Sequence, residues 1–243
     1  MQIKKHLPNL LTLGNLFCGT IATIFAVNDD YLVAGSLVVL GIVFDFFDGF
    51  AARILKVTGE LGKQLDSLAD MVTSGVVPGI IMFQLLKTDS NGGFQLIINN
   101  TNYMPYFGLL LTLAACYRLA NFNIDERQSD SFIGMPTPAM SLFVIALPLI
   151  SMYSSNQFFI DLMQNNYFLI GVTLVLSYLM NAELPLFSLK FKSFGIKENV
   201  LKYVFLTIAL ITIFTFEVVA IPLIIVFYVI LSIVNNFKKK ITV

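Results

Sequence analysis

Residues 45–70 place four aspartates inside one of the most apolar regions of a very apolar chain. The four are Asp45, Asp48, Asp66 and Asp70. On scales derived from helix insertion, an aspartate at the centre of a bilayer costs roughly 2.5–3.5 kcal/mol. Four unpaired aspartates would cost about 10 kcal/mol or more, so something must neutralise them. Cations that prefer oxygen ligands, such as Mg²⁺ or Mn²⁺, are the simplest means.

The rest of the composition indicates a polytopic membrane protein. The 243 residues are 57% hydrophobic and 12% charged, with a mean hydropathy of +0.81. Because the formal net charge is zero, the chain has no basic footprint for nucleic acid. The first apolar run has no convincing cleavage site for a signal peptide, so we expect a retained first helix. We expect one integral membrane domain over residues 1–243.

Eight apolar runs are long enough to cross about 30 Å of hydrocarbon as helices. Clusters of Gly, Pro, Asn and Asp separate them. The runs lie at residues 9–27, 32–54, 63–87, 104–123, 137–154, 167–187, 199–215 and 218–236. The predicted fold is therefore an all-α transmembrane bundle of about eight helices.

The distribution of basic residues predicts the orientation of this bundle. With a cytoplasmic N-terminus and eight spans, 14 of the 15 Lys and Arg residues fall on the cytoplasmic side, and only Lys87 falls outside. Such asymmetry is what the positive-inside rule describes. We therefore expect both termini in the cytoplasm, and an active site that faces the cytoplasm from the inner third of the membrane.

The acidic segment also fits the longer pattern D-x2-D-G-x2-A-R-x8-G-x3-D-x3-D. All eight fixed positions are filled, by Asp45, Asp48, Gly49, Ala52, Arg53, Gly62, Asp66 and Asp70. The pattern resembles the signature of the CDP-alcohol phosphotransferases, membrane enzymes that make phospholipids from a CDP-linked lipid. Simple pairing of buried aspartates with neighbouring basic residues would leave the two glycines and the alanine unexplained.

Helical geometry explains the spacing of this pattern. A period of about 100° per residue puts the motif residues of each helix on one face. The faces carry Asp45, Asp48, Gly49 and Ala52 on the second expected helix, and Gly62, Asp66 and Asp70 on the third. A hairpin turns both faces toward one pocket, where carboxylates could hold two cations about 3.5–4 Å apart.

The resemblance implies a role for each motif residue. Asp45, Asp48 and Asp66 would be ligands of Mg²⁺ or Mn²⁺, with two ions expected, and Asp70 would complete the second metal site or act as general base. Other positions would bind the CDP-lipid: Gly49, Ala52, Arg53 and Gly62, with Thr12 and Asn15 from an opening segment that resembles the family's first helix. Two alternatives stay open, since the small residues would also suit close helix packing and Arg53 would suit interfacial anchoring.

Two further stretches, residues 117–140 and 179–190, resemble the bacterial and archaeal branch of the family that uses serine. That branch implies transfer of a phosphatidyl group from CDP-diacylglycerol to L-serine, among membrane lipids, by a homodimer. Arg118 and Asn123 would then bind serine, although Arg118 could instead pair with Asp125 or Glu126, and Asn123 could cap a helix. Asn121 departs from the branch's pattern, as does the run Asn181-Ala-Glu-Leu-Pro.

The sequence alone leaves two rival functions open. Glycerol 3-phosphate, inositol phosphate or choline could replace serine in the same chemistry. A phosphorylated acceptor should require a cluster of Arg and Lys, and Arg118 has few cationic companions. A cation transporter could also use aspartates in the membrane, but more typically near the midplane and on broken helices.

Overall fold

The computed structural model describes residues 3–57, 59–87, 95–125, 132–187, 195 and 199–241. The first half holds helices α1 (Ile3–Val27), α2 (Tyr31–Leu55), α3 (Glu60–Asp70), the π-helix η1 (Met71–Val76), α4 (Val77–Lys87), the 3₁₀ helix η2 (Met104–Leu109) and α5 (Leu110–Ile124). The second half holds α6 (Thr137–Tyr153), α7 (Gln157–Met163), α8 (Asn166–Asn181), α9 (Val200–Phe216), η3 (Glu217–Val219) and α10 (Ala220–Ile241). Four two-residue strands complete the structure: β1 (Ile97–Ile98), β2 (Thr101–Asn102), β3 (Phe132–Ile133) and β4 (Pro185–Leu186).

The predicted all-α, membrane-spanning character of the chain is confirmed. Within the described ranges, five helical stretches are long and apolar enough to cross a membrane, and α7 with α8 would make a sixth despite a bend of 72°. The count of eight stays a prediction for two reasons. Helix α6 has only 17 residues, and α9 and α10 lie in one apolar stretch that reverses at Glu217, where φ is 48°.

The reversal between α2 and α3 follows from local backbone chemistry. Helix α2 begins at its cap Asp30, whose side chain accepts a hydrogen bond from the Val33 N–H, and ends at Lys56 in the left-handed conformation. The extended backbone of Gly59 then precedes α3. Because this turn is short, the C-terminal end of α2 and the N-terminal end of α3 lie at the same end of the bundle.

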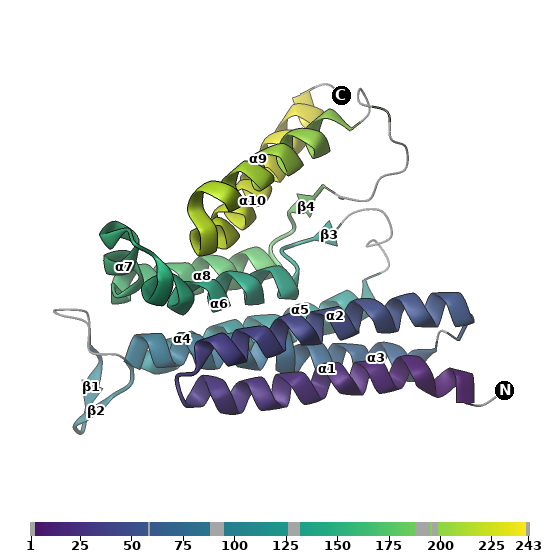
Figure 1. The fold of residues 1–243 in the computed structure, drawn as a ribbon, viewed down its shortest axis with the longest axis horizontal. Helices are drawn as coiled ribbons and strands as arrows, with labels where there is room; N and C mark the ends of the chain where they lie inside the picture. The colour runs from purple at the N-terminus through teal and green to yellow at the C-terminus, as the bar shows by residue number, and fades with distance from the viewer. Residues whose placement is uncertain are drawn as a thin grey trace.

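The helices form two parts that pack against each other (Figure 1). Helices α1 to α5 lie nearly parallel, and α1 makes extensive contacts with both α2 and α3. Helices α6 and α8 lie between this layer and the hairpin of α9 and α10. The largest fully buried side chains come from both parts and include Ile81, Leu111, Met140 and Leu169.

One strand pair joins two segments that are far apart in the sequence. Strand β3 follows α5 and pairs antiparallel with β4, which follows α8, in the register Phe132 with Leu186 and Ile133 with Pro185. The next residue, Gly134, donates its backbone N–H to the Leu184 carbonyl over 2.9 Å. The two stretches that resemble the serine-using branch are therefore paired in space.

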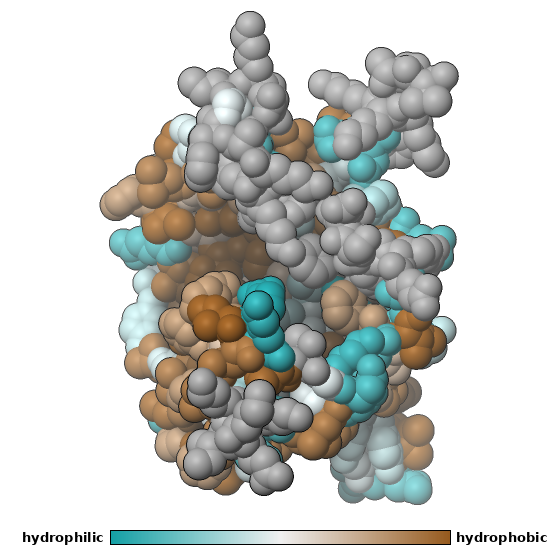
Figure 2. All heavy atoms as spheres, turned by 90° about the vertical axis from the view of Figure 1, so that its right-hand side faces the viewer, coloured by the Kyte–Doolittle hydropathy of each residue, from teal (hydrophilic) through white to brown (hydrophobic). Residues whose placement is uncertain are grey.

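The surface is mostly hydrophobic along the sides of the molecule. Figure 2 looks along the helices of the first layer onto the end where the N-terminus lies, and shows hydrophilic residues together with a hollow lined by hydrophobic ones. Large exposed apolar side chains cover α1, α2, α9 and α10, among them Phe17, Phe46, Phe214 and Ile230. Exposure on this scale suits a chain whose flanks are in contact with lipid.

Candidate active site

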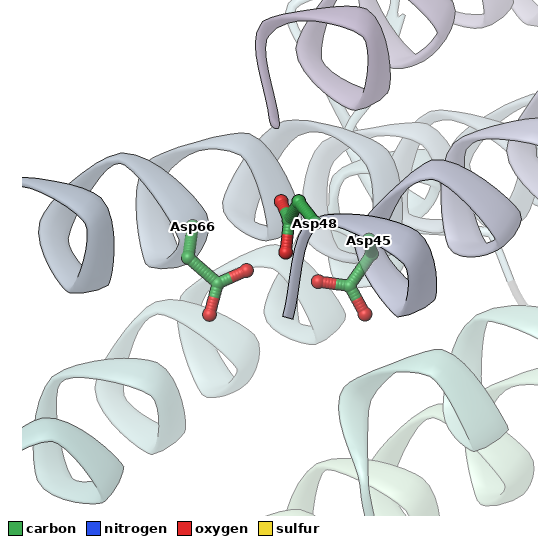
Figure 3. Close-up of side chains that lie close together, drawn as sticks. All are labelled: Asp45, Asp48 and Asp66. Atoms are coloured by element: carbon green, nitrogen blue, oxygen red, sulfur yellow. The ribbon is translucent and has the colours of Figure 1, made fainter. Parts of the chain in front are cut away.

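Three of the four predicted acidic residues converge at the end of the α2–α3 hairpin. Asp45 and Asp48 come from α2 and Asp66 from α3, and one carboxylate oxygen of each lies within 4.8 Å of the others. Figure 3 shows the Asp45 and Asp66 side chains extending toward a shared space, with Asp48 beside them. The convergence follows from the predicted helix faces, which the hairpin brings together.

This carboxylate cluster fits a divalent cation. Asp48 is only 6% exposed, and Oδ1 of Asp66 is buried without a hydrogen-bond partner in the described structure. Oxygen ligands at about 2.0–2.1 Å from Mg²⁺ lie about 4 Å apart across the ion, so small side-chain rotations would bring these three onto one ion. Hard carboxylate oxygens and an otherwise uncompensated negative charge are the donor set that such ions require.

Asp70 stands one turn beyond Asp66, outside the group of three. Its Oδ1 accepts a hydrogen bond from the Asn15 side-chain amide over 3.1 Å. It also has electrostatic interactions with Asp66 and Asp48 and with the Arg118 guanidinium. Asp70 therefore interacts both with carboxylates of the acidic cluster and with a cation, Arg118.

Two residues of α1 form hydrogen bonds with carboxylates of this acidic centre. Thr12 is 3% exposed, and its hydroxyl donates to Oδ2 of Asp48 over 2.5 Å. Asn15 is fully buried, and its backbone carbonyl accepts a hydrogen bond from the hydroxyl of Thr73 in η1 over 3.1 Å. In the structure, Thr12 binds Asp48 and Asn15 binds Asp70 by hydrogen bonds, and the predicted contact of both residues with the CDP-lipid stays a prediction.

A cavity of about 250 Å³ opens directly beside the cluster. Its lining includes most of the family motif together with the start of α1: Pro8, Asn9, Thr12, Asp48, Gly49, Ala52, Arg53, Val57, Gly59, Gly62, Lys63 and Asp66. A Cβ added at Gly49 would meet nothing within 4 Å, and one added at Gly62 would meet only the Asn9 side chain at 3.6 Å. These two glycines therefore leave space in the cavity rather than allow helices to pack closely.

Two cations line the same cavity. Arg53 was expected there, but sequence reasoning missed Lys63 and Asn9. The position of Lys63 directly after the motif residue Gly62 is a signal that could have indicated it. The Lys63 ammonium also donates to the backbone carbonyl of Asn123 at the end of α5. Cations and carboxylates around one small space suit a diphosphate bound with metal ions.

Arg118, which interacts electrostatically with Asp70, is almost fully buried, with 7% of its surface exposed. Its Nε has no hydrogen-bond partner within the described part of the chain. Its guanidinium carbon lies 5.8 Å from the centre of the Phe122 ring. A buried guanidinium with an unused donor can bind an anionic group.

Arg118 lines a second, polar cavity of about 380 Å³. The other lining residues come from the end of α5 and from both sides of the β3–β4 pair: Asn121, Ile124, Asp125, Ile133, Met180, Asn181, Ala182 and Glu183. The Asn181 amide donates to the Ala114 carbonyl over 3.1 Å, which fixes α8 to α5. The alternative partner Glu126 lies outside the described residues.

Asn123 does not line either of these cavities. Its side-chain amide donates to the hydroxyl of Ser67 over 2.8 Å, and its carbonyl accepts from Lys63. Asn123 therefore ties the end of α5 to α3. Its predicted contact with serine stays a prediction, and the structure supports a positioning role for it.

Fold and site together define an integral membrane protein of packed helices, with a carboxylate cluster that can bind a divalent cation at one end of the bundle. Residues 5–180 match the model of the CDP-alcohol phosphatidyltransferase family. The chain belongs to this family, and it is a transferase. The resemblance seen in the motif is thereby confirmed.

The similar curated proteins include bacterial and archaeal enzymes. The chain is 32% identical over 147 residues to a CDP-diacylglycerol–serine O-phosphatidyltransferase of Bacillus subtilis, covering 59% of this chain and 75% of the relative. It is 30% identical over 203 residues to the protein of the same name from Helicobacter pylori, covering 83% and 80%. It is 29% identical to an archaetidylserine synthase of Methanothermobacter thermautotrophicus, covering 61% and 60%.

Proposed function

We propose that this chain transfers the phosphatidyl group of CDP-diacylglycerol to the hydroxyl of L-serine, giving phosphatidylserine and CMP. The observation that carries the proposal is the convergence of the Asp45, Asp48 and Asp66 carboxylates beside a cavity lined by most of the family motif, in a structure that also has a polar cavity at Arg118. One cavity has the features of a nucleotide diphosphate site, and the other has Arg118 on its wall. The names of the similar proteins support serine as the acceptor.

The cavity beside Gly49 and Gly62 would hold the CDP part of the lipid. The missing side chains at these glycines leave room for a nucleotide close to the backbone. Arg53 and Lys63 would bind phosphate oxygens, and the planar guanidinium suits two of them at once. Asp45, Asp48 and Asp66 would hold Mg²⁺ or Mn²⁺, which when bound neutralises charge on the attacking and leaving oxygens.

Asp70 would act as the general base or complete a second metal site, and its hydrogen bond supports the role of base. Serine would attack with its hydroxyl oxygen at the lipid-bearing phosphorus, the bond from that phosphorus to CMP would break, and the hydroxyl proton would pass to Asp70. Because Asn15 binds Oδ1 of Asp70, the side chain is held in one orientation. Correct placement of the base and the nucleophile supplies much of the catalysis in reactions of this kind.

The polar cavity beside Arg118 would bind the serine head group. Arg118 would bind the carboxylate of serine, while Asp125 and Glu183, which line the same cavity, would favour its ammonium group. A phosphorylated alcohol would bring a dianion toward these two carboxylates, with Arg118 as the one cation among the described lining residues. This charge arrangement favours a zwitterionic acceptor over glycerol 3-phosphate or inositol phosphate.

The membrane arrangement is part of the same proposal. We place eight traverses in one domain, with α9 and α10 as separate spans joined at Glu217 and with both termini in the cytoplasm. The acidic cluster then faces the cytoplasm, where serine is available and CMP can leave. A homodimer is proposed from the family resemblance. Membership in a transferase family favours this reading over the cation transporter.

The direct test is an acceptor comparison with the purified full chain. In lipid nanodiscs with CDP-diacylglycerol and Mg²⁺, CMP release should require L-serine, and mass spectrometry should identify phosphatidylserine. Glycerol 3-phosphate, inositol phosphate and choline should each support much slower release. Faster release with any of these three would replace the acceptor and leave the reaction class intact. Absence of CMP release with every alcohol would refute the reaction class itself.

A further inference from the structure

The chain between α8 and the end of β4 forms one wall of the polar cavity beside Arg118. Ala182 and Glu183 line that cavity, and so does Ile133 of β3. Strand β4 begins two residues after Glu183, and its Pro185 pairs with Ile133. We call residues 182–187 the β4 segment. A displacement of the β4 segment would therefore move the wall of the cavity that we assign to the acceptor.

The β3–β4 pair is too short to fix this wall by itself. Each strand has only two residues, and an isolated pair of strands is marginally stable at best. Next to the pair, the Gly134 N–H donates to the Leu184 carbonyl and the Met135 N–H to the Leu179 carbonyl, over 2.9 Å each. Neither of these two bonds reaches residues 185–187, so another element is needed to hold the end of the β4 segment.

Helix α10 supplies this hold from a distant part of the sequence, and it lies beside β4 (Figure 1). The Tyr228 hydroxyl donates to the Phe187 carbonyl over 2.8 Å, and the Asn236 side-chain amide donates to the Pro185 carbonyl. Ser232, halfway between the two donors along the helix, is fully buried. Residues four apart lie on one side of a helix, so one face of α10 follows the β4 segment.

Aromatic packing holds the end of the β4 segment against both helices of the hairpin. The centre of the Phe187 ring lies 4.9 Å from that of Tyr228 in α10 and 5.9 Å from that of Phe205 in α9. The Phe205 and Tyr228 rings are themselves 5.6 Å apart. Rings at these separations attract one another. The hairpin therefore contacts both the backbone and a side chain of the segment.

The hairpin has no direct place in either of the two substrate cavities. Among the described residues that line the cavity beside Gly49 and the cavity beside Arg118, none comes from α9 or α10. The match to the family model also ends at residue 180, before the β4 segment and the hairpin. A part of these helices in the reaction would therefore be indirect, through the segment that they hold.

We propose that Tyr228 and Asn236 are positioning residues for the acceptor. By binding the carbonyls of the β4 segment, they keep Ala182 and Glu183 in place as a wall of the Arg118 cavity. The inference rests on the proposed function for the role of that cavity. Loss of either hydrogen bond would loosen the wall and weaken serine binding, while the acidic cluster and the cavity for the CDP-lipid would be unchanged.

Two substitutions remove these hydrogen bonds one at a time. Tyr228→Phe keeps the aromatic ring and loses the hydroxyl, and Asn236→Ala loses the amide donor. From the net contribution of one hydrogen bond, KM for serine should rise about 2- to 12-fold in each variant. The double variant should lose more than either. KM for CDP-diacylglycerol, and kcat at saturating serine, should stay within about twofold, because neither substitution touches a group that contacts the reacting atoms.

Asn235→Ala and Tyr167→Phe are the matched controls. Asn235 lies about 100° around α10 from Asn236, and Tyr167 is 63% exposed on α8. Both controls should keep the KM for serine. Asn236→Gln, which keeps an amide donor, should lose less than Asn236→Ala. A KM for serine in Tyr228→Phe and Asn236→Ala equal to that of the controls would overturn the proposal, and so would an equal rise of KM for both substrates.

Hydrogen exchange of the purified full chain in nanodiscs gives a readout that does not depend on turnover. Amides of residues 132–135 and 182–187 should exchange faster in Tyr228→Phe and Asn236→Ala, because the strand pair opens more often, and amides of α3 should not change. Unchanged exchange in the β4 segment would refute the hold by α10. Faster exchange with an unaltered KM for serine would refute its link to the acceptor. Faster exchange in a chain that released no CMP with any alcohol would support the hold and refute only the proposed reaction.

Discussion

The side-chain amide of Asn15 donates a hydrogen bond to Oδ1 of Asp70 over 3.1 Å, between residues 55 positions apart. The same asparagine accepts a hydrogen bond on its backbone carbonyl from Thr73, in the π-helix that directly follows Asp70. The proposed base is therefore held from the first helix. A π-helix at this point is consistent with a functional site, where such segments are frequent.

Replacement of Asn15 by alanine should slow the reaction without weakening substrate binding. A hydrogen bond to a charged group contributes about 1.5–3 kcal/mol, so kcat should fall about 10- to 150-fold. KM for both substrates should change little, because Asn15 orients the base and contacts neither. Thr20→Ala is the control, as its exposed hydroxyl donates to the Leu16 carbonyl of its own helix. A full kcat in Asn15→Ala would show that Asp70 does not need this hydrogen bond.

Gly134→Ala should destabilise the β3–β4 strand pair, which joins the two stretches that resemble the serine-using branch. Gly134 has φ of +75°, and an added Cβ would collide with the Met180 carbonyl and lie 3.2 Å from that of Ala182. Strain of this kind costs about 1–3 kcal/mol, which should lower the thermal midpoint in detergent. Gly171→Ala, in an open helical position, should raise the midpoint slightly. A higher midpoint for Gly134→Ala than for Gly171→Ala would contradict the strained geometry.

Arg118→Ala should weaken serine binding selectively. A contact between guanidinium and carboxylate contributes about 1.5–3 kcal/mol, so KM for serine should rise about 10- to 150-fold. KM for CDP-diacylglycerol should change much less, because that substrate binds in the other cavity. Arg118→Lys should recover part of the loss, since it keeps the charge without the planar fork. An equal loss for both substrates would make Arg118 a phosphate ligand or a structural residue.

Local spacing made the acidic cluster predictable. Asp45 and Asp48 are one helical turn apart, Asp66 lies on the facing helix, and a short hairpin joins the two helices. Helical periodicity therefore sufficed to predict that they converge. It could not separate two reasons for Gly49, because close packing and an open cavity both require a small residue. The empty space around Gly49 decides in favour of the cavity.

Contacts between distant segments were not predictable in the same way. The pairing of Ile133 with Pro185 joins segments separated by two spans, and no hydropathy pattern encodes it. The apolar cavity lined by α6, α8 and α10 is a similar case. Helices α6 and α8 are hydrophobic around most of their circumference, so periodicity does not indicate which face lines a cavity. Helix α7 was not predicted, although the polar run at residues 164–166 marked the place of the 72° bend between α7 and α8.

The proposed orientation can be tested with single cysteines. In a chain with Cys18→Ala and Cys116→Ala, Glu60→Cys marks the exposed start of α3 and Asn100→Cys marks the exposed β1–β2 turn. An impermeant maleimide should label Asn100→Cys in intact cells, and Glu60→Cys only after permeabilisation. The excess of Lys and Arg near the acidic end motivates this expectation. The reverse labelling pattern would place the site on the other side of the membrane.

The central claim is that the carboxylates of Asp45, Asp48 and Asp66 form a divalent-metal centre for phosphatidyl transfer. The most direct measurement is incorporation of labelled serine into lipid by the purified full chain, first in excess EDTA and then with Mg²⁺ or Mn²⁺ added back. We predict no activity above background in EDTA, recovery with either ion, and a loss of several orders of magnitude in Asp66→Asn that added metal does not restore. Full incorporation in excess EDTA, or an Asp66→Asn variant as active as the unmodified chain, would contradict the account.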